Sequence, residues 1–176
     1  MARRLLIFNA PDRFVAGAIG EPGDRTFYLQ ARQGNAVASV ALEKLQVAAL
    51  AARLDDLLTA VADEAPAPTE VTADEGPLEE PVIDLFRVGA MALAWDSGGG
   101  RVVIEAQPLS EDGDYVEVPD DVEEGPDVLR VAISPAHAHE FVRRASALVA
   151  AGRPACPFCG ESLEPGGHFC PKVSLN

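Results

Sequence analysis

The sequence predicts an α+β fold in which a mainly antiparallel sheet is covered by two amphipathic helices. Short runs of β-branched and aromatic residues, bounded by turn residues, occur as two separate sets along the chain. Each set is followed by one longer stretch in which apolar residues recur at helical spacing. The chain has 176 residues, of which 48% are hydrophobic, so it is long enough to bury a core without help from a metal ion.

The first set of strands should form a hairpin-rich sheet, and it is expected at residues 4–9, 13–19, 25–32 and 36–41. In the third of these strands polar and apolar side chains alternate, so that strand should expose one face. From Leu42 the spacing becomes helical, which predicts one long amphipathic helix over residues 42–63. Its apolar positions are Leu42, Leu45, Ala49, Leu50, Leu54, Leu57, Leu58 and Val61.

Residues 64–80 are rich in proline, acidic and small residues, and they are expected to form a mobile linker without stable structure. The second set of strands follows at residues 85–95, 101–107 and 128–133. Ser134 and Pro135 predict the start of a second helix, because Ser134 can cap free amides and Pro135 needs no hydrogen-bond donor in the first turn. This helix should end near Ala151, before Gly152.

The order of strands followed by one helix in residues 4–63 recurs in residues 82–151, which is a weak internal pseudo-repeat of topology. The simplest organisation is one α+β domain over residues 1–152, followed by a short appendage at 153–176. Two separate small domains are the alternative.

The net charge of −14 is carried by two segments rather than by the whole surface. Residues 63–80 hold seven of the 28 acidic residues and residues 110–127 hold nine, and neither segment contains Lys or Arg. The rest of the chain has 12 acidic residues against 14 basic ones, so it is slightly positive. The linker and the acidic loop at 110–127 are interpreted as solvating segments, and engagement of a basic partner is the alternative.

The C-terminal end contains the run Cys156-Pro157-Phe158-Cys159-Gly160, followed by His168-Phe169-Cys170. Cys-x-x-Cys followed by Gly is typical of a zinc knuckle, because two thiolates converge on one ion and Gly accepts the positive φ of the turn. Residues at i and i+2 of an extended segment point to the same side, so the histidine and the last cysteine can complete a tetrahedral set. We therefore predict one structural zinc ion bound by Cys156, Cys159, His168 and Cys170. An accidental cluster and a redox-active Cys156–Cys159 pair are the alternatives.

A second candidate site is a polar patch near the start of the sheet, formed by Arg13, Arg25, Tyr28, Gln30 and Arg32. Guanidinium groups suit recognition of oxyanions through paired hydrogen bonds, so this patch could bind a small phosphorylated or acidic metabolite. A solvated sheet face is the alternative interpretation. His137 and His139, at i and i+2 of the second helix, should lie on different faces and share no metal.

The sequence contains none of the phosphate-loop, dinucleotide, nucleophile-elbow or zinc-protease motifs, and no combination of acid, base and nucleophile. This favours a non-enzymatic adaptor that binds a protein partner, and an enzyme or ligand-binding protein that uses the polar patch is the alternative. A nucleic-acid partner is not expected, because Lys and Arg form no stripe. Three clustered cysteines fit a reducing cytoplasm, and no apolar run approaches the ~18 residues of a membrane span.

Three segments together carry a family resemblance: the N-terminal Ala10-Pro11-Asp12-Arg13-Phe14-Val15-Ala16-Gly17, the later Phe27-Tyr28-Leu29-Gln30-Ala31-Arg32, and the terminal Cys156-Pro157-Phe158-Cys159-Gly160. With them the chain resembles an uncharacterised actinobacterial protein family, a domain of unknown function with a zinc-knuckle tail. The resemblance covers nearly the whole chain. It implies no particular activity.

Overall fold

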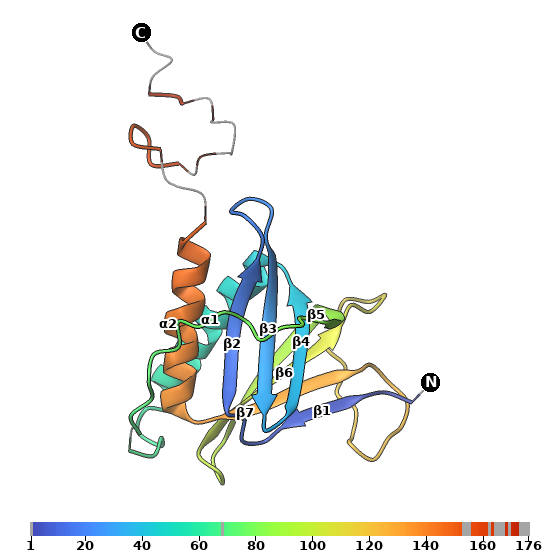
Figure 1. The fold of residues 1–176 in the computed structure, drawn as a ribbon. Coiled ribbons are helices and arrows are strands. Elements are labelled where there is room, and N and C mark those ends of the chain that lie inside the picture. Colours follow the sequence, from blue (N-terminus) through green and yellow to red (C-terminus); the bar gives the residue numbers. More distant parts are fainter. Residues whose placement is uncertain are drawn as a thin grey trace.

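The computed structural model describes residues 2–67, 69–152, 156–161, 163, 168 and 170–172. Within these residues seven strands form one mixed sheet, and two helices pack on one of its faces (Figure 1). The strands are β1 (Leu5–Phe8), β2 (Arg13–Ile19), β3 (Thr26–Gln33), β4 (Ala36–Leu42), β5 (Asp84–Asp96), β6 (Arg101–Pro108) and β7 (Val128–Ile133). The helices are α1 (Lys44–Ala60) and α2 (Pro135–Ala150). Every predicted strand and helix is present, and the ends differ from the prediction by at most three residues.

The strand order in the sheet is β1-β7-β6-β5-β4-β3-β2. Pairing is antiparallel within the hairpins, but β1 runs parallel to β7 and β4 runs parallel to β5. The prediction of a mainly antiparallel sheet is therefore wrong, and the sheet is mixed. The turn signals identify hairpins, which are antiparallel, whereas both parallel pairs join strands separated by long connections, and such pairs carry no local signal.

Helix α1 buries the stripe Val47, Leu50, Ala51, Leu54 and Leu58 against the core. Leu45, which was assigned to the apolar face, is instead 82% exposed, because the buried stripe begins at Val47. The start of the helix is fixed by Gln46, whose side-chain Oε1 accepts a hydrogen bond from the Glu43 backbone N–H at 2.7 Å.

Helix α2 begins as predicted, since the Ser134 hydroxyl accepts a hydrogen bond from the His137 backbone N–H at 3.1 Å and Pro135 occupies the first turn. Phe141 of α2 stacks on Phe14 of β2, with ring centroids 4.8 Å apart and planes 11° from parallel. Both rings are almost completely buried, and they join the helix layer to the edge of the sheet. Among the described residues, neither helix combines the length and the apolar character needed to cross a bilayer.

The sheet face opposite the helices is covered by two irregular segments, here called the first strap (residues 69–81) and the second strap (residues 109–127). The first strap runs across β2, β3 and β4 in Figure 1. Its Leu78 is only 8% exposed and lies over Gly17, where a Cβ would come within 2.6 Å of the leucine side chain. In its described residues the expected linker thus has no helix or strand, but it is packed on the sheet, because Leu78 and the charged groups of the strap find partners there.

Candidate metal centre

The C-terminal cysteines are held by a tight turn. The Gly160 backbone N–H donates to the Cys156 carbonyl at 2.9 Å, and the Cys156 N–H donates to the Glu161 carbonyl at 2.7 Å. Gly160 has φ +78°, the left-handed conformation that the sequence assigned to it. This turn brings the sulfurs of Cys156 and Cys159 to the same side.

Four possible ligand atoms, from Cys156, Cys159, His168 and Cys170, all lie within 4.8 Å of one another. The Cys156 and Cys170 sulfurs are 3.9 Å apart, and the Cys159 sulfur is 3.3 Å from His168 Nε2. In a tetrahedral zinc site, bond lengths of ~2.3 Å to sulfur and ~2.0 Å to nitrogen place two sulfurs about 3.8 Å apart and a sulfur and a nitrogen about 3.5 Å apart. The donor set and its spacing fit one metal ion, and these four residues could bind one.

The electrostatics of the turn favour a metal-binding thiolate. The backbone N–H groups of Cys159 and Phe158 lower the pKa of the Cys156 thiol, and the thiolate is the form that binds metal. His168 directs Nε2 toward the sulfurs, while its Nδ1 is buried and has no hydrogen-bond partner in the described part of the chain.

Four residues of the predicted polar patch lie on the paired strands β2 and β3, where Arg13 is directly opposite Arg32, and Arg25 lies before β3. Arg13 donates from Nε and Nη2 to the two Asp74 carboxylate oxygens, at 2.6 and 3.0 Å. Arg32 Nε lies 3.1 Å from a Glu79 oxygen. Tyr28 is half-buried, and Arg25, before β3, stacks over Phe27 with its Cζ 5.1 Å from the ring centroid. The structure uses Arg13 and Arg32 to hold the first strap and places Arg25 elsewhere.

Gln30, the fifth residue of the patch, is 2% exposed and holds the first strap through its side-chain amide. Its Nε2 donates to the Glu79 carbonyl at 3.0 Å and its Oε1 accepts from the Glu79 N–H at 2.8 Å. Gln107 of β6 does the same for the second strap: Nε2 donates to the Val116 carbonyl at 2.6 Å and Oε1 accepts from the Val116 N–H at 2.9 Å. The sequence did not identify Gln107 as a residue that holds a strap. The one available signal is its position in an apolar strand that leads into an acidic loop.

The acidic straps are also bound by arginines of the sheet and of α2. Asp74 lies between Arg13 and Arg144, and hydrogen bonding from Arg13 lowers the pKa of its carboxyl. The other ion pairs between straps and arginines are Glu75–Arg143, Glu79–Arg32, Asp120–Arg130 and Asp127–Arg4. Arginines outside the two acidic segments thus form ion pairs with carboxylates inside them.

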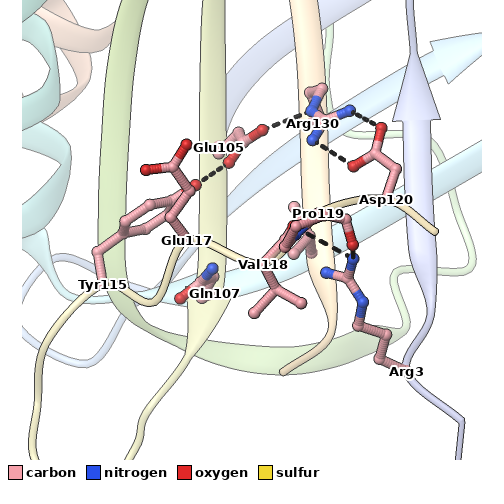
Figure 2. Close-up of a pocket in the computed structure, with 10 residues that line it drawn as sticks. Arg3, Glu105, Gln107, Tyr115, Glu117, Val118, Pro119, Asp120 and Arg130 are labelled. Carbon is pink, nitrogen blue, oxygen red and sulfur yellow. Dashed lines mark hydrogen bonds and ion pairs between the residues drawn. The ribbon is translucent and has the colours of Figure 1, made fainter. Parts of the chain in front are cut away.

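A cavity of about 490 Å³ lies beneath the second strap (Figure 2). Arg130 bridges Glu105 and Asp120 there, at 2.5 and 2.8 Å. The Tyr115 hydroxyl donates to Glu105, and burial, together with this carboxylate, raises the pKa of Tyr115 to about 12. Arg3 donates to the carbonyls of Pro119 and Val122 at 2.5 and 2.8 Å. These charged and polar side chains of the cavity are hydrogen-bonded to one another or to the second strap, and these contacts hold the strap on the sheet.

His137 and His139 of α2 differ in their exposure to solvent. His137 is half-buried, and burial lowers the pKa of its imidazole, whereas His139 is exposed. In the described residues the one group of three or more close Cys, His, Asp or Glu ligand atoms is the C-terminal cluster.

Fold and site together define an α+β protein with a mixed seven-stranded sheet and a C-terminal Cys₃His cluster that could bind a metal ion. The chain belongs to the family described as Protein of unknown function (DUF3090), whose model matches residues 6–170 and so includes all four cluster residues. No curated protein and no solved structure shows a significant match to it.

Proposed function

We propose that the C-terminal cluster binds one zinc ion and that the folded metal segment is a non-enzymatic adaptor for a protein partner. The observation that carries this proposal is the convergence of four ligand atoms within 4.8 Å beside an exposed aromatic side chain, Phe158. Three soft thiolates and one imidazole match the preference of zinc for sulfur and nitrogen ligands. Four protein ligands leave no position for a reactive water, so the metal has a structural role.

Phe158 is the side chain that we assign to partner binding. It lies between the first two ligands of the cluster and is 64% exposed. Aromatic residues are enriched among the side chains that dominate interface energies, and a metal-bound turn would present this one in a fixed orientation. A reducing cytoplasm is the compartment in which three closely spaced thiols stay available to zinc. A protein partner is favoured over nucleic acid, since phosphate backbones require clustered positive charge and Lys and Arg form no stripe in the sequence.

Metal content tests the first half of the proposal. The full chain, purified without added chelator, should contain about one zinc per chain, and Cys159→Ser or His168→Ala should remove it, because three ligands bind zinc far more weakly than four. The matched control is His139→Ala, which removes an exposed histidine outside the cluster. A chelator should change the NMR signals of residues 156–172 and leave those of the sheet and helices in place. A zinc content that is unchanged in both ligand variants would contradict the proposal.

Partner binding tests the second half. Phe158→Ser should retain zinc but lose a partner that co-purifies reproducibly with the zinc-loaded chain, and the zinc-free chain should lose the same partner. Ile83→Ser is the control, since Ile83 is also exposed, at 63%, and lies outside the metal segment. Equal recovery of the partner by wild type and Phe158→Ser would contradict the adaptor role while leaving the zinc site intact.

The alternative proposal is an enzyme or a metabolite-binding protein that uses the polar patch instead of the metal segment. Within the polar patch, Arg13, Gln30 and Arg32 are engaged by the first strap. Arg13 lines one cavity together with Asp74, its ion-pair partner, whereas Arg25 lines another cavity and has no acidic partner of its own among the described residues. Any recognition of a phosphorylated or acidic metabolite is therefore expected at that cavity.

A further inference from the structure

A cavity of about 680 Å³ lies where the starts of β3 and α1 meet the end of α2, separate from the C-terminal cluster. Three basic side chains line it, Arg25, Lys44 and Arg87, and its one acidic side chain is Glu43. Phe27, Leu42 and Leu45 form an apolar wall. Leu45 is the α1 side chain that is 82% exposed, so its methyl groups are accessible from the cavity.

Two of these basic groups lack an acidic partner in a chain of net charge −14. Most arginines of the described residues bind a carboxylate or a backbone carbonyl. Within that part of the chain, Lys44 makes no hydrogen bond or ion pair, and Arg25 contacts only the Phe27 ring through its guanidinium. Arg87 lies 3.0 Å from Glu43, in an ion pair that is more than half exposed on both sides.

The cavity therefore carries two more positive than negative side chains, which is the opposite of the protein as a whole. The Lys44 ammonium packs against Gly152, just after α2, where there is no side chain. A Cβ at residue 152 would lie only 2.6 Å from Lys44 Nζ. Unpaired cations that line one open cavity attract an anion, and both are accessible to solvent.

We infer that this cavity binds the phosphate group of a small organic phosphate. A phosphate monoester carries roughly −1.5 to −2 charges at neutral pH, which matches the excess positive charge of the cavity. The guanidinium of Arg25 and the ammonium of Lys44 supply hydrogen-bond donors, and Leu45 contacts the organic part. This binding site is independent of the metal-dependent adaptor role.

Titration of the ¹⁵N-labelled full chain with phenyl phosphate, inorganic phosphate and the neutral benzyl alcohol tests the inference at low salt. Phenyl phosphate should shift the amide signals of residues 23–27, 42–45 and 87 in a saturable manner. Lys44→Gln and Arg25→Gln should each weaken this binding about tenfold, the effect of losing one charge-assisted hydrogen bond. Arg53→Gln, which removes an exposed cation outside the cavity, should leave the affinity unchanged.

The three probes separate the sources of the phosphate. Tighter binding of phenyl phosphate than of inorganic phosphate supports an organic phosphate as the ligand. Equal affinity for both would overturn the assignment of an organic ligand and indicate free phosphate instead. Benzyl alcohol should not bind, and saturable binding of it would overturn the role of the cations. The inference as a whole fails if phenyl phosphate does not saturate, or if Arg53→Gln weakens binding as much as Lys44→Gln.

Discussion

Gln30 offers a direct measure of how strongly the first strap is held. Its amide makes three hydrogen bonds, to Ser39 Oγ at 3.1 Å and to the Glu79 carbonyl and N–H at 3.0 and 2.8 Å. Replacement by leucine keeps the side-chain volume but removes all three. At a net value of about 0.5–1.5 kcal/mol for each bond, and with two peptide groups of the strap left unpaired, Gln30→Leu should cost about 2–4 kcal/mol of unfolding free energy.

Urea denaturation measures this loss, and hydrogen exchange at the Glu79 amide shows whether the strap detaches before the rest of the protein unfolds. Gln107→Leu should behave similarly at the second strap, with a smaller loss because Gln107 makes two such bonds. The control is Gln33→Leu, since Gln33 is exposed and accepts one hydrogen bond from Ala10, and it should change stability by about 0.5 kcal/mol or less. The reasoning is refuted if Gln30→Leu is as stable as wild type and its Glu79 amide exchanges no faster.

Two further outcomes follow from burial and packing. Burial lowers the pKa of His137 below its usual 6.5, so the unfolded chain binds the proton more readily than the folded chain does. The free energy of unfolding should therefore fall as the pH drops from about 6.5 toward the lowered pKa of the folded state. Urea denaturation from pH 7 to 5 should show a shallower decline in His137→Gln, and an unchanged decline would argue against this histidine. Gly89→Ala should destabilise the protein by about 1–3 kcal/mol in thermal melts, because the new Cβ would lie 2.3 Å from the Leu109 backbone Cα. Gly98→Ala, whose Cβ would meet only Asp96 at 3.5 Å, should melt close to wild type, and equal losses in both variants would exclude the clash as the cause.

The secondary structure was predictable because its signals are local. Turn residues separate the strands, and the caps at Ser134 and Pro135 locate α2 to within a residue. The metal cluster was predictable for a similar reason: its four ligands lie within 15 consecutive positions, from Cys156 to Cys170, and their types already define the chemistry. Neither inference required knowledge of which distant segments meet.

What the sequence did not reveal depends on long-range contacts. The parallel pairs β1–β7 and β4–β5 join strands that lie far apart along the chain. The acidic composition of residues 64–80 indicated a mobile linker, because composition does not show that Arg13 and Arg144 converge on Asp74. The hydrogen bond from Gln30 to the Glu79 carbonyl could not be predicted for the same reason, since the two residues are 49 positions apart.

The position of β1 has a consequence for how the chain folds during synthesis. Leu5–Phe8 leaves the ribosome well before Val128–Ile133, the strand beside which it lies in the finished sheet. Until β7 is made, β1 has no place in the sheet and its backbone groups stay hydrated. Its short length and the two arginines that precede it limit association with other nascent chains during this interval. A strand made well before its partner thus joins the sheet only after β7 is made, and closing this long loop is the slow step that we expect in refolding.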